Sequence, residues 1–473
     1  MKLKTIRAGL FRETRPPCGT IQARSRHGSS WSTALSFVAL LATCPCSTSA
    51  AAADIPALLR EAIAHHPSIR SQQGLQAAAE AGVSAARWSF WPTPSIASER
   101  AGTGQNDAVY RGGNTVTTVR LQQPLWTGGR LSGHLDRAQA LALAAQADFE
   151  TARQRLALRI VESASDILVA QLKLDAYRQS RDVHARLLAM VERRTREGAS
   201  AQADVHLAHS RLDAIEADLQ SARAQRDTGL DRLRLLVGRQ LAAESPDARL
   251  PPHLDTELDL DPLLASARQH SPQLIKAHAQ AKVAEAEIGI ARAALSPEIY
   301  VRVERQWGSF NAASQAPQNR VFVGMSTAFG GGLSSLSGIQ AAQARHDAAR
   351  DDIEAQQLAI DEQIQGDLIL FRTAGTRRAG LERARRSAAE VSASWERQFL
   401  AGRKQWQDLM NAARELAQND AQLADAIGAQ YLTGWRLTLL AQGVDGVLDD
   451  ALAARQAASG AEPSAPPPTG TFR

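Results

Sequence analysis

Residues 58–100 read LLREAIAHHPSIRSQQGLQAAAEAGVSAARWSFWPTPSIASER, and residues 263–305 read LLASARQHSPQLIKAHAQAKVAEAEIGIARAALSPEIYVRVER. The two stretches align without a gap, and their identical pairs include Leu58/Leu263, His65/His270, Pro67/Pro272, Arg87/Arg292 and Glu99/Glu304. The match continues further along, because Gly198 with Asp204 corresponds to Gly402 with Asp408. One unit of about two hundred residues has therefore been duplicated, and such a repeat fixes the architecture before any other feature. A duplicated scaffold without catalytic motifs favours a structural or transport role over an enzyme.

The first 53 residues are typical of a secretory signal peptide rather than of the fold. Lys and Arg residues precede an apolar segment at 34–42, and small residues follow up to Ala53. This order of basic, apolar and small residues predicts cleavage near Ala53 and export from the cytoplasm. All three cysteines, Cys18, Cys44 and Cys46, lie in this segment, so none remains for disulfides or thiolate chemistry in the mature chain. A lipoprotein cleavage site at Cys44 is the less favoured alternative.

The positive charge of the whole chain belongs mostly to this signal. The full sequence has 54 Lys and Arg against 49 Asp and Glu, and residues 1–53 hold 7 of the former and 1 of the latter. The remainder therefore has 47 basic and 48 acidic residues. A balance so close to neutral removes the main electrostatic argument for nucleic-acid binding, and no nucleic-acid partner is expected.

Each copy opens with two helices separated by a proline. Helical periodicity predicts helices over 55–65 and 67–90 in the first copy, and over 261–270 and 272–295 in the second. Pro67 and Pro272 mark the breaks, since proline cannot continue a helical hydrogen-bond ladder and disfavours helix in the residue before it. His65, His66 and His270 stand at these corners, where we expect capping or packing rather than acid–base catalysis.

Beyond the second helix of each copy the period of the sequence changes to two. Ile299, Val301 and Val303 alternate with Tyr300, Arg302 and Glu304, and similar alternation recurs at 117–122 and 321–326. This pattern predicts strands with one apolar face and one polar or small face. The strands fall at about 94–125 and about 297–329, as two hairpins with polar, glycine-containing loops. Strands of about ten residues can cross a bilayer when they are tilted.

Two hairpins provide only four strands, and four strands cannot close a barrel. A membrane, however, tolerates no open sheet edge. Either the hairpins are soluble, or several chains pool their strands. A trimer would supply twelve strands, an even number within the range of outer-membrane barrels. If the strands enter a membrane, the sequence therefore predicts an oligomer.

Very long helices follow the glycine pairs Gly128-Gly129 and Gly331-Gly332, which we expect to be tight joints between strand and helix. The proline-free stretches cover about 130–196 and 333–400, and at 1.5 Å per residue each spans about 100 Å. A glycine ends each stretch, and return helices are expected at about 201–237 and 405–440. The predicted organisation is a signal at 1–53, repeats at 54–250 and 262–445, a linker at 251–261, and a disordered Pro-rich tail at 446–473.

Other candidate chemical sites in the sequence are weak. His206 and His209 are three residues apart on a helix, but no third metal ligand stands nearby. The run Gly330–Gly332 lacks the Lys-Ser/Thr of a phosphate-binding loop. The arginine cluster at 377–386 is expected to be a solvated helix face that includes Glu382. The sequence therefore predicts no enzyme activity, no metal site and no cofactor.

Asp204 and Asp408 are more informative, because they occupy the same place in the two copies, just beyond a helix break. In a trimer each would form a ring of three carboxylates, and such a ring at a pore favours cations. The alternative is that each residue merely begins a helix, where a negative side chain suits the helix dipole. Spacing alone leaves these two interpretations equal.

The order and spacing of several short motifs resemble the TolC family of outer-membrane efflux and secretion channels. The motifs are Ala62 with Pro67, Ala267 with Pro272, the run LQQPLWTGG at 121–129, Gly198 with Asp204 and Ala208, and Gly402 with Asp408 and Ala412. The resemblance covers nearly all of residues 54–445. It implies a mainly α fold with a membrane β-barrel portion: a homotrimer whose twelve-stranded barrel in the outer membrane joins a long α-helical barrel across the periplasm.

The resemblance also implies site residues at the periplasmic tip. In the family, a first-repeat aspartate contacts aromatic and basic residues of the second repeat and closes the pore, and the matching positions are Asp204, Phe399 and Lys404. Asp408 matches an acidic ring at the entrance, whose second acidic position is Asn411 in this chain. Because Phe399 lacks the hydroxyl of the family's tyrosine and Lys404 replaces an arginine, a weaker latch is expected.

The function implied is a passive conduit that works with a periplasmic adaptor (a membrane fusion protein) and an inner-membrane transporter, in contact with outer-membrane lipid. The general pattern resembles type I secretion partners, which serve an ABC exporter and an exported protein toxin. Two alternatives stay open: the outer-membrane component of a tripartite small-molecule efflux pump, and a soluble periplasmic coiled-coil scaffold. The identity of the neighbouring genes would distinguish type I secretion from small-molecule efflux, and membrane association of the protein would test the scaffold hypothesis.

Overall fold

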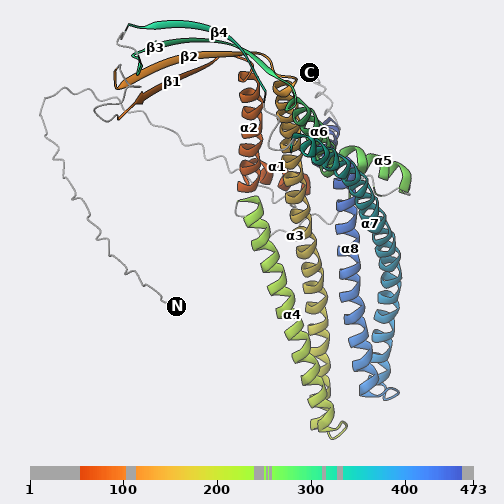
Figure 1. Ribbon diagram of the computed structural model, residues 1–473. Coiled ribbons are helices and arrows are strands. Elements are labelled where there is room, and N and C mark those ends of the chain that lie inside the picture. Colours follow the sequence, from red (N-terminus) through yellow and green to blue (C-terminus); the bar gives the residue numbers. More distant parts are fainter. Residues whose placement is uncertain are drawn as a thin grey trace, which may run out of the picture. The chain divides into compact units, whose positions relative to one another are not determined.

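The computed structural model describes residues 54–102, 113–238, 250–251, 254, 258–311, 316–327 and 334–460. The predicted signal at 1–53 with its cysteines, the joint residues Gly331 and Gly332, and residues 461–473 lie outside the described residues. The described part of the chain is mainly helical, as expected, and carries one small sheet (Figure 1).

The same series of elements occurs twice, in agreement with the sequence repeat. The first copy comprises α1 (Ile55–His65), α2 (Pro67–Trp88), β1 (Thr93–Arg100), β2 (Thr115–Trp126), α3 (Arg130–Arg196) and α4 (Gln202–Val237). The second comprises α5 (Leu260–His270), α6 (Pro272–Ala293), β3 (Glu298–Trp307), β4 (Gln318–Ser326), α7 (Ser334–Leu400) and α8 (Trp406–Gly460). The predicted helices and strands therefore all exist, with boundaries that shift by a few residues, apart from the longer end of α8.

The proline breaks begin helices in both copies. Pro67 and Pro272 occupy the first turns of α2 and α6, where the N–H that proline lacks would have no partner within the helix. The residue before each proline caps the helix. His66 Nδ1 accepts a hydrogen bond from the backbone N–H two residues later at 3.2 Å, and Ser271 Oγ accepts one from the N–H three residues later at 3.3 Å. The expected structural role of this corner is confirmed for His66.

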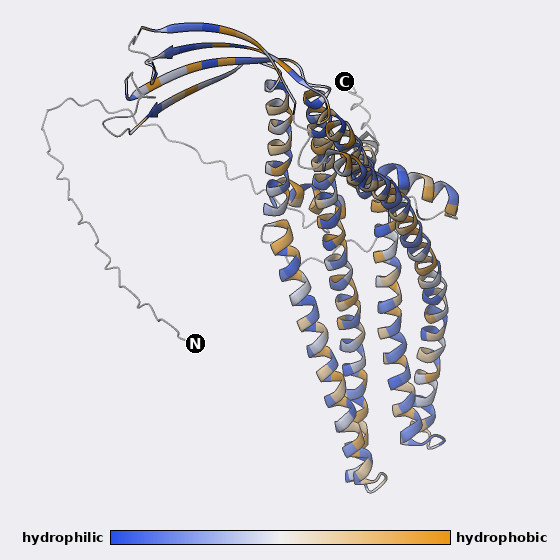
Figure 2. Cartoon of the chain, viewed as in Figure 1, coloured by the Kyte–Doolittle hydropathy of each residue, from blue (hydrophilic) through white to orange (hydrophobic). Residues whose placement is uncertain are grey.

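The four strands form one antiparallel sheet in the order β1-β2-β3-β4, so pairing of β2 with β3 joins the two predicted hairpins. Residues that pair across strands share a face. One face carries the apolar residues Pro94, Ile96, Val119, Leu121, Val301, Val303, Val321, Val323 and Met325. The opposite face is mainly polar and carries Ser95, Arg120, Gln122, Arg302, Glu304, Gln306, Gln318 and Arg320. The expected division into two faces is confirmed, and Figure 2 shows the alternation along the strands.

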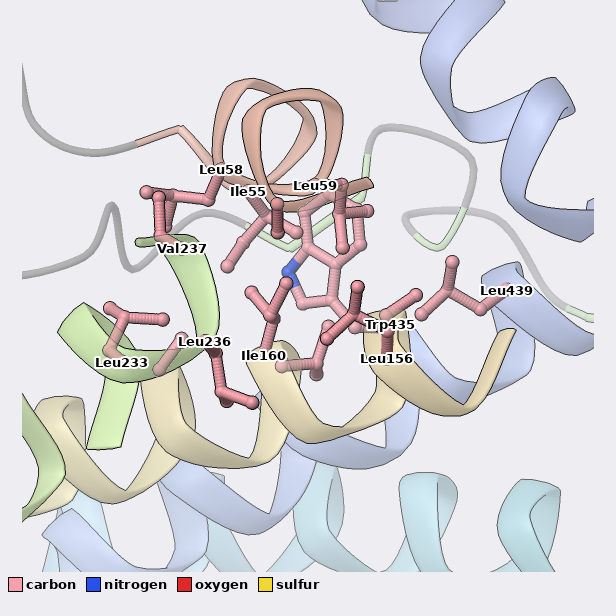
Figure 3. Close-up of a cluster of buried hydrophobic side chains, with 14 of the residues drawn as sticks. Ile55, Leu58, Leu59, Leu156, Ile160, Leu233, Leu236, Val237, Trp435 and Leu439 are labelled. Carbon is pink, nitrogen blue, oxygen red and sulfur yellow. The ribbon is translucent and has the colours of Figure 1, made fainter. Parts of the chain in front are cut away.

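The helices next to the sheet pack in the same order as the strands. α2 packs against α3, α3 against α6, and α6 against α7, while α4 and α8 return along α3 and α7. α8 also contacts α3, which ties the two copies together. The largest core cluster forms where α1 meets α3, α4 and α8, and it includes Leu58, Leu59, Ile160, Leu233 and Trp435 (Figure 3). This cluster joins α1 and the C-terminal end of α4 to the middle of α3 and to α8.

The C-terminal boundary differs from the expectation. α8 continues to Gly460, so the prediction of a disordered tail at 446–473 is wrong for residues 446–460. The physical reason is that Val444 and Val447 are buried in the core cluster with α1 and α3, and no proline interrupts the segment before Pro463. The helix is kinked at Gly443, whose φ of 72° and ψ of 177° are not helical. Among the described helices, none combines the length and the apolar character needed to cross a bilayer.

Candidate functional site

The turns that join α3 to α4 and α7 to α8 lie at the end of the long helices remote from the sheet (Figure 1). α3 starts just after β2 and continues for 67 residues. At 1.5 Å per residue its far end is about 100 Å from the strands. Residues 187–213 and 395–413 are called the tip below, and all the gate and ring residues selected from the sequence lie within it.

The tip is built from one backbone turn that occurs twice. The N–H of Gly198 donates to the carbonyl of Thr195 at 3.1 Å, and the next N–H donates to the carbonyl of Arg194 at 2.7 Å. In the second copy the N–H of Gly402 donates to the carbonyl of Phe399 at 3.0 Å, and the N–H of Arg403 donates to the carbonyl of Gln398 at 2.8 Å. The two glycines have φ of 75° and 72°, the left-handed conformation that ends many helices and that glycine adopts without steric cost.

Asp204 and Asp408 lie in the first turns of α4 and α8. Their negative charges therefore stand at helix N-termini, where the helix dipole favours them. This position agrees with the simpler of the two interpretations drawn from the sequence. It does not conflict with the other, because a residue that begins a helix at the tip can also face a pore.

Phe399 packs at the contact between the two copies. Its ring is buried together with Trp406, with ring centroids 5.4 Å apart, and both belong to a cluster that includes Val191 of α3 and Val205 of α4. The guanidinium of Arg194 lies 4.7 Å from the centroid of the Phe399 ring, within the range of a cation–π interaction. Phe399 thus holds the α7–α8 turn against α3 and α4.

Lys404 contacts residues of the second repeat, to which it belongs. Its Nζ lies 3.6 Å from Asp408 Oδ2 and 4.2 Å from the centroid of the Trp395 ring. Asp204 is half-buried one residue before Val205, and no ion pair reaches its carboxylate from the described residues. Asn411 is exposed. Within one chain Lys404 therefore binds Asp408, and a contact of Asp204 with Lys404 or Phe399 of a second chain stays a prediction.

Sequence reasoning missed three residues of the tip: Arg194, Trp395 and Trp406. A signal was present, because the aligned turns differ in their side chains. Phe399 and Trp406 correspond to Thr195 and Gln202 in the first copy. The second turn therefore has aromatic residues where the first has polar ones. Such a difference within a repeated motif indicates that the two turns have different roles.

The glycine joint between β2 and α3 has a clear structural reason. Gly128 and Gly129 have φ of 61° and 91°, which residues with a side chain rarely adopt. A Cβ at Gly128 would also lie 2.2 Å from the Cβ of Ser296 at the start of the second hairpin. The strand can therefore turn into the helix only where both residues lack a side chain.

The remaining candidates have structural roles. His209 Nε2 lies 3.5 Å from a carboxylate oxygen of Glu192 on α3. Arg378 of the arginine cluster pairs with Glu382 at 3.0 Å, as expected for a solvated helix face. Within the described ranges, no group of three or more His, Cys, Asp and Glu side chains is arranged to hold a metal ion.

His184 lies on α3 one turn before the tip and is buried. Its Nδ1 is 2.8 Å from the carbonyl oxygen of Ser180. Burial is the main cause that lowers the pKa of His184; the hydrogen bond to Ser180 opposes it, and the positive charge of Arg211 adds to it. Asp218 and Arg414 line the same groove. Because its pKa in the fold lies below that of the unfolded chain, His184 favours the folded state at neutral pH, and this contribution is lost as the pH falls through the ordinary histidine range.

We expect the melting temperature of the protein to fall between about pH 7.5 and about pH 5.5, because the unfolded chain binds a proton that buried His184 resists. His184→Gln removes the titration and should reduce this fall, whereas His206→Gln, at an exposed position of α4, should leave it unchanged. Thermal unfolding followed by far-ultraviolet circular dichroism measures all three proteins. An identical pH dependence in the His184→Gln protein would contradict the role of His184.

We expect Phe399→Ala to loosen the tip, since truncation of a buried phenylalanine costs about 3–5 kcal/mol. Limited trypsin digestion checks this, because Arg194, Arg403 and Lys404 lie near the ring in sequence or in space, and loosening of the turn lets the backbone at these residues enter the protease. The control is Leu400→Ala, the next residue, whose side chain is 61% exposed. Cleavage at the tip should accelerate at least tenfold for Phe399→Ala and change little for Leu400→Ala. Equal rates for both variants would mean that Phe399 does not hold the tip together.

Comparison with known proteins gives curated relatives and solved structures that match most of the chain. The chain is 26% identical over 363 residues to Protein CyaE of Bordetella pertussis, with 74% of each chain covered. It is 25% identical over 349 residues to the alkaline protease secretion protein AprF of Pseudomonas aeruginosa, with 71% of this chain and 70% of that protein covered. The outer membrane protein VceC from Vibrio cholerae has the same fold, with a TM-score of 0.70 at 16% identity over 82% of this chain and 96% of that chain.

The family model described as outer membrane efflux protein matches residues 58–239 and 263–441. Each match covers one copy of the repeat, and together they cover most of the chain. This result excludes the reading as a soluble periplasmic scaffold. The chain belongs to the outer membrane efflux protein family, the TolC family of non-enzymatic transport channels of the outer membrane that extend into the periplasm.

Proposed function

We propose that this protein is the outer-membrane component of a type I secretion system. It acts as a passive trimeric conduit through which an inner-membrane ABC exporter and its periplasmic adaptor release a protein toxin. The observation that carries the conduit is the sheet, which has one apolar face, one polar face and two edges without a partner strand among the described residues. Such a sheet is incomplete until other chains pair with it.

The edge strands of the sheet and the outermost helices of the series α2, α3, α6, α7 lie on the same two sides of the chain. β1 and β4 are the edge strands, and α2 and α7 are the outer members of the series α2, α3, α6, α7. If several chains were arranged around a rotation axis, β4 of one chain would pair with β1 of the next chain, and α7 of the first would lie against α2 of the second. Three copies give twelve strands, an even number within the bacterial range, and the family resemblance selects three.

The two faces of the sheet fit the two environments of a barrel wall. Val323 and Met325 on the apolar face are 75% and 70% exposed in the single chain. Toward outer-membrane lipid these side chains lose contact with water, which is favourable by about 25 cal/mol per Å² of apolar surface. The polar face then lines an aqueous lumen, the alternation found in outer-membrane barrels.

The gate belongs to the other end of the molecule, at the tip. In the trimer Asp408 would form a ring at the periplasmic entrance, and Asp204, Phe399 and Lys404 would hold the entrance closed until the adaptor docks. The Lys404–Asp408 pair in this chain moderates the negative charge of that ring. No source of energy is needed in the conduit itself, because the inner-membrane transporter supplies it.

The assignment of a protein cargo is supported by the relative AprF, whose name gives it as an alkaline protease secretion protein. The alternative is the outer-membrane component of a tripartite pump for small molecules, supported by the description of the family as efflux proteins. Deletion of the gene separates the two: loss of a secreted protein from the medium supports secretion, and increased sensitivity to toxic small molecules without that loss supports efflux.

Planar-bilayer recording of the detergent-extracted protein tests the conduit and its entrance. Discrete channels should appear, and multivalent cations added on the periplasmic side should block them by binding the carboxylate ring. Asp408→Asn should weaken the block, and Asn411→Asp should strengthen it by restoring a second acidic position. Channels that both variants leave equally sensitive to cations would keep the conduit and reject the ring. Absence from the outer-membrane fraction would reject the conduit.

We expect Leu121→Lys to prevent assembly in the outer membrane and Gln122→Lys to be tolerated. The two residues are neighbours on β2 but lie on opposite faces of the sheet. A lysine at the bilayer midplane on the lipid side costs about 2–4 kcal/mol, whereas a lysine in the lumen stays hydrated. The yield of heat-modifiable trimer in outer-membrane fractions measures both variants. Equal yields would mean that the faces have been assigned wrongly.

A further inference from the structure

Three arginines surround a single glutamate on the polar face of the sheet. Glu304 on β3 pairs in register with Arg120 on β2 and with Arg320 on β4, and Arg302 lies two positions before it on the same face. Arg120 Nε is 3.6 Å and Arg302 Nε 3.5 Å from Glu304 Oε2. The Glu304 side chain is only 9% exposed beneath them. The surface of this group therefore consists of guanidinium groups.

One carboxylate cannot neutralise three guanidiniums, so the group keeps an excess of positive charge. The other acidic residues of this face in the described strands are Glu99 and Glu298. Glu298 is already paired with Arg130 at 2.8 Å. Glu99 lies four positions along β1 from Ser95, the residue that pairs with Arg120. Within one chain, at 3.3 Å per residue, this is about 13 Å, beyond the Debye length of about 8 Å at physiological salt.

Aromatic side chains hold part of the group in place. The guanidinium of Arg302 lies 4.6 Å from the Phe322 ring centroid and 5.9 Å from that of Tyr300. Tyr300 in turn covers Gly324, where a Cβ would lie 2.5 Å from the ring. Arg320 donates a hydrogen bond to Gln318 Oε1. An arginine that is stacked or hydrogen-bonded in this way is pre-organised, so its charge stays at a fixed position on the wall.

We propose that Arg120, Arg302 and Arg320 form an arginine belt around the lumen of the barrel, which favours the passage of anionic groups, namely carboxylates and phosphates, over cations. This inference rests on the proposed channel, since only the pairing of edges between copies encloses the polar face. Three copies bring nine arginines and three glutamates to the wall, and rings of arginine are the arrangement that favours anions. The belt is opposite in sign to the Asp408 ring, so the two ends of the conduit prefer opposite charges.

A single engineered thiol measures the potential at the belt without requiring an open tip. Beyond Cys46 the chain has no cysteine, and Ser95→Cys introduces one on β1 beside Arg120. Intact cells are treated from outside with an anionic and with a cationic methanethiosulfonate reagent, and each rate is divided by the rate for a small free thiol. We expect the anionic reagent to be favoured by about tenfold or more, because charged clefts carry potentials of several kT. Arg120→Gln together with Arg320→Gln should bring the ratio toward one, and Arg120→Lys should preserve it.

The control Ile96→Cys is the next residue of β1, on the apolar face, and should react with neither reagent because lipid covers it. A corrected ratio near one, or one that favours the cationic reagent, in the Ser95→Cys protein overturns the belt but leaves the channel, since reaction itself shows an aqueous lumen. Reaction at Ile96→Cys with none at Ser95→Cys overturns the assignment of the faces, and the belt with it. The ratio in the Ser95→Cys protein decides the sign of the potential even if the glutamine variants do not assemble.

Discussion

Backbone hydrogen bonding at the two edges of the sheet is the constraint on which the architecture depends. Hydrocarbon offers no partner to an unpaired N–H or C=O, and each chain has two such edges, on β1 and β4. The same two sides of the chain carry α2 and α7, which end the helix series. The sheet and the helix series therefore both lack neighbours on the same two sides of the chain, and in the proposed trimer one rotation onto a neighbouring chain would complete both. In the proposed trimer each chain would supply four of the twelve strands of the wall, and the two other chains would supply the rest.

Local signals were sufficient to predict most of the elements. Proline and glycine set the boundaries of the helices, and the change of period from helical to two located the strands on the chain. Pairing of β2 with β3 could not be predicted in this way, because no local pattern states which hairpins meet across more than 170 residues of sequence. The end of α8 was missed for a related reason. Residues 444–460 look weakly patterned until Val444 and Val447 are seen to fill a core built by α1 and α3.

At the tip the repeat predicted the positions but not the partners. Asp204 and Asp408 were selected because they recur, and both lie in first turns as equivalent residues should. The contact between Arg194 and Phe399 and the pairing of Lys404 with Asp408 beside Trp395 depend on which helices lie together and on rotamers. Such information is tertiary, and only the unequal aromatic content of the two turns pointed to it in the sequence.

The two turns of the tip have the same backbone conformation but different side chains. This difference affects how many partner molecules can bind to one channel. In a trimer the backbone would show six nearly equivalent helix pairs, whereas the Phe399–Trp406 cluster and Lys404 would occur only three times. A partner that recognises the grooves between helices can occupy six sites on one channel. A partner that recognises the aromatic turn is limited to three. In the proposed trimer, the number of partner molecules on one channel would therefore depend on whether those partners contact the repeated main chain or the side chains of the aromatic turn.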